Sequence, residues 1–342
     1  MKVRHAGGVT ATERGRALAL IAFLCLLMLA AITAVALGTT TMPFSTIISA
    51  IFQYDGSRDH LLVTTIRLPR VIAALLAGSA LAVSGAIMQA VTNNPLASPG
   101  LLGINAGAAF AVVTAMTFFG TGMSDVYLLY AFLGAGTAAL VVFTLGSLGG
   151  IGHSPLGLVL AGAIVATFLT SLTTAVLIFD ESTLDAVRLW TAGSVTGRTM
   201  VQARTVAPAL LVGLVAAFLL GRHLTTLSLG ADASRTLGQN PIVWRGASVV
   251  VVILLAGSAV ALAGPIGFVG LVVPHVVRML VGIDYRWVLP FCALGGALLV
   301  VVSDMAGRLV FGSQSFPVGV TVALVGAPFF LYLAHTRLKG AA

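Results

Sequence analysis

The chain has 342 residues, of which 58% are hydrophobic and only 8% are charged, and its mean hydropathy is +1.08. Because soluble globular domains carry roughly 25% charged residues, this composition excludes an ordinary soluble domain and predicts a polytopic membrane protein. The net charge of +8 does not indicate a nucleic-acid partner, since the basic residues are scattered between apolar runs.

Ten apolar runs follow one another along the chain. A helix needs about 20 apolar residues to cross a bilayer, and the candidates are residues 17–38, 71–90, 101–119, 128–148, 156–179, 205–220, 246–263, 268–281, 289–310 and 318–334. The first run is too long for the core of a signal peptide, so we expect it to be retained. The sequence therefore predicts an all-α polytopic membrane protein with about ten transmembrane helices in one transmembrane domain, residues 1–342.

The eighth run is short and interrupted. The segment 264–278 contains Gly264, Gly267 and Gly270 together with Pro265 and Pro274. Proline removes a backbone donor and clashes with the preceding turn, so we expect broken or short helices near residues 264–282. Inside a bilayer the freed backbone groups need protein or water partners, and such breaks are typical of transport proteins rather than of simple anchors.

The basic residues predict the orientation of the chain. If the N-terminus is inside and the spans alternate, eleven basic and three acidic residues lie on the cytoplasmic side, against seven of each outside. This bias favours both termini in the cytoplasm. In this orientation, residues 222–245 form the longest polar interval on the cytoplasmic side.

Several kinds of chemistry are not predicted. Lysine occurs only at Lys2 and Lys339, so the chain has no P-loop lysine, and any ATP hydrolysis must take place on another subunit. The six histidines lie far apart without ligand spacing, and His275 in the interrupted run is expected to be structural. We therefore expect no enzymatic activity, no metal site and no cofactor.

Small residues recur at helical spacing in two of the runs. Such stripes let helix backbones approach closely in a membrane, and we expect tight helix packing at Ala74, Gly78, Ala82, Ala86 and Ala90 and at Gly103, Gly107, Ala111 and Ala115.

Three groups of motifs carry a family resemblance. The first group begins at Arg67-Leu68-Pro69-Arg70 and continues through residues 84–89 and 94–103. The second is residues 264–278 followed by 284–287, and the third comprises Asp304, Arg308 and residues 317–319 and 326–328. Over residues 17–336 the chain resembles the permease subunits of ABC importers for ferric siderophores, haem and cobalamin.

The resemblance implies a ten-helix permease of the inner membrane that pairs with an identical or sister permease around a central path. Two cytoplasmic ATPase subunits and an extracytoplasmic binding protein are the implied partners, and an iron chelate is the implied cargo. Residues 188–194 and 284–287 are most similar to permeases for catecholate-type ferric siderophores. Haem and cobalamin permeases share most of the same motifs, so both stay open as alternatives.

The interval 222–245 is similar to the family's coupling loop, which docks on the ATPase. Asp232 and Ala233 suit a helix start and Gly238 suits its end. The implied coupling residues are Gly230, Asp232, Ser234, Arg235, Leu237 and Gly238. The sequence departs from the family pattern at Ala231 and Ser234, and an ordinary solvated loop is the alternative interpretation.

By the same resemblance, Arg67, Arg70 and Arg308 are expected at the outer face, where they would pair with acids of the binding protein. Reversing Arg67 and Arg70 to glutamate should then weaken docking and leave folding intact. Snorkelling toward lipid headgroups is one alternative, and pairing of Arg308 with Asp304, one helical turn away, is another. Ser315-Phe316 departs from the family pattern nearby.

A stripe of hydroxyl side chains marks the fifth run. Thr167, Thr170, Ser171 and Thr174 share one helical face, and in the family this helix lines the transport path. Hydroxyl groups can also bond back to their own helix, so a purely structural stripe is the alternative.

Two other classes of protein remain as alternatives. An ion-coupled secondary transporter would place acids or histidines within the membrane, and the candidates are Asp304 and His275. An integral membrane enzyme would need a cluster of catalytic or metal-binding residues, which the sequence does not display.

Overall fold

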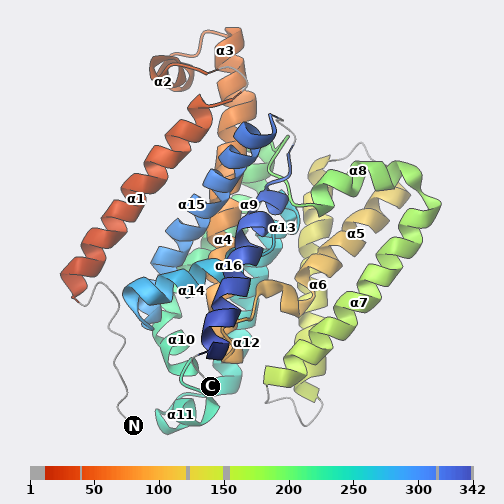
Figure 1. The fold of residues 1–342 in the computed structure, drawn as a ribbon. Coiled ribbons are helices and arrows are strands. Elements are labelled where there is room, and N and C mark those ends of the chain that lie inside the picture. The colour runs from red at the N-terminus through yellow and green to blue at the C-terminus, as the bar shows by residue number, and fades with distance from the viewer. Residues whose placement is uncertain (1–11, 39–40, 121–123, 149–154, 313–315, 340–342) are drawn as a thin grey trace.

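The computed structural model describes residues 12–38, 41–120, 124–148, 155–312 and 316–339, which form helices joined by short connections (Figure 1). Within these ranges no strand occurs. Seven helical segments are long and apolar enough to cross a membrane, and three more apolar helices are shorter. Each of these segments overlaps one of the ten predicted runs. The prediction of an all-α membrane protein is confirmed.

The helices take the following bounds in chain order: α1 (Glu13–Ala36), α2 (Phe44–Phe52), α3 (Arg58–Leu61), η1 (Leu62–Arg67), α4 (Leu68–Thr92), η2 (Pro99–Leu102), α5 (Ile104–Phe119), α6 (Ser124–Leu148), α7 (Pro155–Phe179), α8 (Glu181–Thr191), α9 (Met200–Leu219), α10 (Gly221–Leu227), α11 (Ala231–Thr236), α12 (Pro241–Val252), η3 (Ile253–Gly257), α13 (Ser258–Ala263), α14 (Val269–Val281), α15 (Tyr285–Phe311) and α16 (Val318–Lys339).

Helix α4 is the centre of the molecule. Almost all of its residues are buried, and it contacts α15, α14, α13, α12 and α9. It crosses α15 so closely at Gly78 that a Cβ there would overlap the carbonyl of Gly296, and it approaches α14 in the same way at Gly85 and Gly270. The stripe that begins at Ala74 is buried as expected. Van der Waals contact at these close approaches holds the helices together, because a bilayer supplies no hydrophobic driving force between them.

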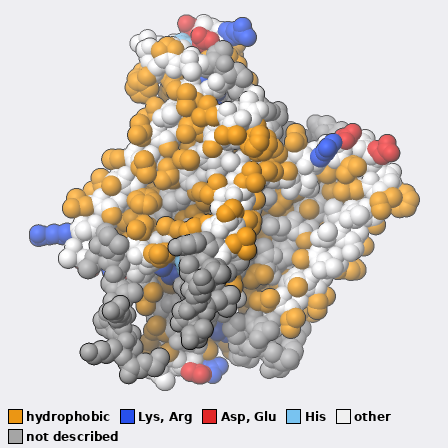
Figure 2. Space-filling model, in the orientation of Figure 1, with side chains coloured by type: hydrophobic (Ala, Val, Ile, Leu, Met, Phe, Trp, Pro, Cys, Tyr) orange, Lys and Arg blue, Asp and Glu red, His pale blue; other side chains and the backbone are white. Residues whose placement is uncertain are grey.

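Helices α5, α6 and α7 pack on one another and stand beside the bundle around α4 and α15 (Figure 1). Helix α6 joins them to that bundle by packing on η3 and α13, whereas α7 contacts α5, α6, η2 and α8. Figure 2 shows that hydrophobic side chains cover the middle of the visible face, and that the few visible charged side chains lie near its edges. This distribution suits a bilayer around the helices.

The expected break after the seventh run is confirmed. Helix α13 ends at Ala263 and α14 begins at Val269, and the connection is held by backbone from elsewhere. Ser194 N donates to Ala263 O at 2.8 Å, and Gly319 N donates to Gly193 O at 2.9 Å. Gly264 has φ +71° and ψ −176°, a conformation that is essentially restricted to glycine. A Cβ at Gly264 would also overlap the carbonyl of Trp190.

Gly264→Ala should therefore lower the stability of the protein by at least roughly 1–3 kcal/mol, the usual cost of such backbone strain. The matched control is Gly267→Ala in the same connection, where a Cβ would meet no atom within 4 Å. Thermal unfolding of both variants in detergent provides the comparison. Equal melting temperatures for the two variants would contradict the packing described for the break.

Candidate functional site

A buried cluster of charged side chains joins α4 to α15 at the end of the bundle that carries α2. The carboxylate of Asp304 accepts three hydrogen bonds from Arg70, one from Nη2 at 2.8 Å and two from Nε at 3.0 and 3.1 Å. Arg308 Nε lies 3.2 Å from the same carboxylate. Asp304 and Arg70 are each only 4% exposed, so this carboxylate neutralises two guanidinium groups away from solvent.

The same cluster binds the C-terminal end of α1. Arg67 Nη1 donates to the carbonyls of Val35 and Ala36, both at 2.9 Å. Arg308 donates to Leu37 O at 2.9 Å and to Ala34 O at 3.2 Å. The last turn of α1 has no basic residue of its own, and its free carbonyls carry the negative end of the helix dipole. Arginines from α15 and from η1, just before α4, therefore cap α1.

The three arginines expected at the outer face lie at the end of the bundle that carries α2, and all three are buried. Arg67, Arg70 and Arg308 are 8%, 4% and 8% exposed, and their bonds are made inside the chain. The pairing of Arg308 with Asp304, which the sequence offered as an alternative, is present, whereas the bond from Arg70 was not predicted. Reversal of Arg67 and Arg70 to glutamate is consequently expected to disturb folding. Docking of a binding protein is not tested by this geometry and stays a prediction.

The interval 222–245 contains two short helices, α10 and α11. Helix α11 begins at Ala231, one residue before the predicted start, and ends at Thr236, before Gly238. Ser234 is fully buried and donates through Oγ to Thr226 O at 3.0 Å. The side chains of Asp232 and Arg235 are exposed, and Leu237 is 63% exposed. Helix α11 therefore presents a charged and apolar surface that no described residue covers.

Hydrogen bonds connect α10, the helix that precedes α11, to α4 and α15. With its amide oriented to donate, Asn93 at the end of α4 bonds Ser228 O at 2.9 Å and Leu227 O at 3.2 Å. Thr225 in α10 accepts from the backbone N–H of Tyr285, the first residue of α15, at 3.0 Å. Asp284 caps α15, and its hydrogen bonds with Arg286 hold the pKa of the carboxyl below its usual range. The cap thus stays charged at neutral pH.

The hydroxyl stripe lies on an open face of α7. Thr167, Thr170, Ser171 and Thr174 are exposed in this chain. Ser171 Oγ donates to Thr167 O at 3.0 Å, and Thr174 Oγ1 donates to Thr170 O at 2.9 Å. The stripe is therefore weakly polar, because two of its hydroxyl protons are bonded within the helix. Both a lining role and a structural role fit this arrangement.

Other elements near these sites were not predicted. The hairpin of α2 and α3 and the amphipathic helix α8 are too short to register as spans. Helix α8 exposes Glu181, Asp185 and Arg188. Its buried residues Thr183, Val187 and Trp190 recur at helical spacing, and a search of the sequence for short amphipathic helices could have found this pattern. Among the described residues, no three His, Cys, Asp or Glu side chains gather in a way that could hold a metal ion.

The buried cluster predicts a large effect of removing its carboxylate. Asp304→Asn removes the carboxylate that two buried arginines share and should cost about 3–5 kcal/mol, as is usual when one partner of a buried ion pair is lost. The control Asp185→Asn changes the same chemical group at an exposed position of α8. Thermal unfolding in detergent should give a lower melting temperature for Asp304→Asn than for Asp185→Asn. Arg70→Met combined with Asp304→Leu should recover part of the stability that Asp304→Asn loses. A melting temperature of Asp304→Asn equal to that of the control would contradict this account.

Comparison with known proteins assigns the chain to a family. Residues 26–336 match the FecCD transport family. The chain is 42% identical over 333 residues to the iron(3+)-hydroxamate import permease FhuB of Bacillus subtilis, covering 97% of this chain and 86% of FhuB. It is 39% identical over 327 residues to the ferric enterobactin permease FepD of Escherichia coli, covering 96% and 98% of the two chains.

Two further similarities agree with this. The hemin transport permease HmuU of Yersinia pestis is 36% identical over 320 residues, covering 91% of this chain and 93% of HmuU. A solved structure described as an inward-facing metal-chelate type ABC transporter superposes with a TM-score of 0.79 at 27% identity, covering 94% of this chain and 99% of that one. The chain therefore belongs to the FecCD transport family.

Proposed function

We propose that this chain is the membrane permease subunit of an ABC importer for an iron chelate, most directly a ferric siderophore. The observation that carries the proposal is similarity over nearly the whole chain to permeases named for ferric hydroxamate and ferric enterobactin. The helix break after Ala263 supports it, because irregular backbone at membrane depth is typical of transporters. The similarity to a hemin permease keeps haem as the first alternative cargo, and cobalamin is the second.

The proposed assembly contains a second permease, two ATPase subunits and a binding protein. We place the chain in the inner membrane with both termini in the cytoplasm, as the charge bias predicts. The surface of α11, with Asp232, Arg235 and Leu237, is then the part of the coupling loop 222–245 that docks on an ATPase. Gly230 and Gly238 bound this helix, and buried Ser234 fixes it to α10.

Docking of ATPase subunits would move α11, and the bonds of Asn93 and Tyr285 would carry that movement into α4 and α15. The open hydroxyl face of α7 suits a path that lets a bulky chelate pass without trapping it. Arg67, Arg70 and Arg308 are assigned an indirect part in docking, because they hold together the end of the bundle from which the α2–α3 hairpin projects.

An ion-coupled secondary transporter is a remote alternative. The acid that such a mechanism would use, Asp304, is buried and bonded to Arg70 and Arg308, so its carboxylate already serves to join two helices. His275 contacts the ring of Phe329, with centroids 6.5 Å apart.

Deletion of the gene, followed by measurement of radio-iron uptake from ferric siderophores, tests the proposed function. Siderophore uptake should be lost, growth on haem iron should persist, and a plasmid copy of the gene should restore uptake. Lost growth on haem with intact siderophore uptake would instead make the chain a haem permease. If neither changed in a strain without a second siderophore system, the iron-chelate proposal would be wrong, and cobalamin uptake would be measured next.

A further inference from the structure

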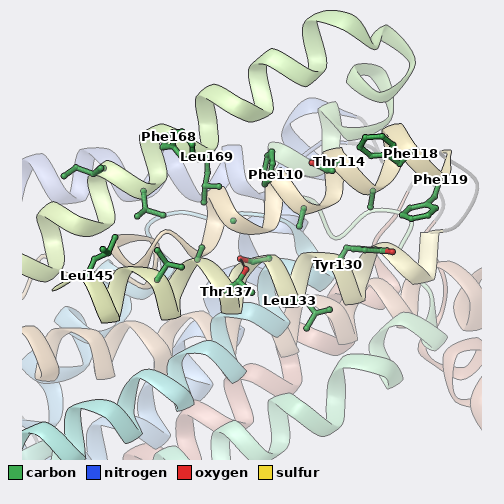
Figure 3. Close-up of a pocket in the computed structure, with 18 residues that line it drawn as sticks. Phe110, Thr114, Phe118, Phe119, Tyr130, Leu133, Thr137, Leu145, Phe168 and Leu169 are labelled. Atoms are coloured by element: carbon green, nitrogen blue, oxygen red, sulfur yellow. Dashed lines mark hydrogen bonds between the residues drawn. The ribbon is translucent and has the colours of Figure 1, made fainter. Parts of the chain in front are cut away.

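A groove of about 730 Å³ lies between α5, α6 and α7 (Figure 3). Its walls are apolar and aromatic, and they include Phe110, Phe118, Leu133, Phe168 and Leu169. The volume lies within the roughly 300–1,000 Å³ of sites that bind small molecules. The hydroxyl of Thr137 in the wall donates to Gly134 O at 3.1 Å, so it is already bonded within α6. The groove therefore suits a hydrocarbon ligand.

The groove is long enough to hold an acyl chain over the full hydrocarbon depth of one leaflet. Its lining runs along α6 from Tyr130 to Leu145, which is about 22 Å at a rise of 1.5 Å per residue. The hydrocarbon of one leaflet is about half of the roughly 30 Å core. At the Tyr130 end, the ring of Tyr130 stacks on Phe119 with centroids 5.9 Å apart. Aromatic rings with a polar tip are typical of the membrane interface, so the groove leads from an interface into the hydrocarbon core.

The groove and the hydroxyl stripe occupy different faces of α7. The groove-lining residues Ile164, Val165, Phe168 and Leu169 are centred about 140° around the helix from the stripe, at 100° per residue. Ile164 and Phe168 are 67% and 62% exposed, so this second face is also uncovered in the chain. The proposed function assigns the hydroxyl stripe of α7 to the transport path. We therefore expect the groove face of α7, which points away from that path, to contact lipid.

We propose that the groove binds an acyl chain of a bilayer phospholipid, which packs between α5, α6 and α7 and supports α7. Helix α7 contacts the rest of the chain through α5, α6, η2 and α8, so a hydrocarbon chain in the groove adds apolar contact on a side where those helices leave a hollow. Such contacts are individually small and collectively large. The assignment of the groove face to lipid rests on the proposed transport path along the other face of α7, and the lipid site itself goes beyond the proposed transport function.

Tryptophan fluorescence can test the site on the detergent-purified protein. Leu133→Trp places a reporter at the edge of the groove (Figure 3). Leu129→Trp is the matched control, one helical turn away on α6 and outside the groove lining, with a similar exposed fraction (51% for Leu133 and 58% for Leu129). The probe is phosphatidylethanolamine with brominated acyl chains, which quench nearby indole rings, and wild-type protein corrects for the three native tryptophans.

We expect saturable quenching of Leu133→Trp, with a midpoint at about tenfold lower lipid concentration than for the control, which corresponds to about 1.4 kcal/mol. Adding Thr137→Phe to Leu133→Trp fills the groove and should raise that midpoint, while elution profile and circular dichroism report whether the variant is folded. Equal, unsaturable quenching at both positions would mean an ordinary lipid-facing surface and would overturn the proposal. An unchanged midpoint in a folded Thr137→Phe variant would also overturn it, and neither result would affect the transport proposal.

Discussion

Asp304 neutralises two buried arginines at once, because its carboxylate lies against both Arg70 and Arg308 in the apolar surroundings of α4 and α15. An unpaired charge in such a place would be far more costly than the pair. Once Asp304 holds Arg70 and Arg308, the remaining donors of Arg308, together with Arg67, are positioned to bind the last carbonyls of α1. One carboxylate thus determines how three helices meet at this end of the bundle.

The two helices joined by Asp304 are also joined elsewhere. Gly78 and Gly296 bring their backbones together in the middle, and Asn93 and Tyr285 attach their opposite ends to the segment that carries α11. Because packed helices of this kind shift between discrete arrangements rather than bend continuously, α4 and α15 are suited to move as one body. Together the two helices connect the α11 surface that is proposed to dock on an ATPase to the end of the bundle where α2 and α3 project.

Hydropathy was sufficient to predict the seven long apolar helices and the three shorter ones, and Gly264 with Pro265 was sufficient to predict the break, because both depend on local chemistry that the bilayer makes strict. The start of α11 near Asp232 was predictable from local chemistry as well, because an acidic residue is favoured in the first turn of a helix. The partners of Arg70 were not, since Asp304 lies 234 residues away and no local pattern joins the two. From the sequence alone, an arginine near the end of a span is interpreted as interfacial. Only the fold reveals that the end of α1 requires a cap.

The central claim is that transport through this chain is driven by ATP through the surface of α11. The most direct measurement is uptake of ferric siderophore into liposomes that contain this chain with its ATPase and binding protein, for wild type and for Leu237→Asp. The account predicts uptake that requires ATP, no uptake with a proton gradient alone, and a loss of at least about tenfold in the variant, as expected when an interface contact is replaced by a charge. Uptake with a proton gradient and no ATP would contradict it.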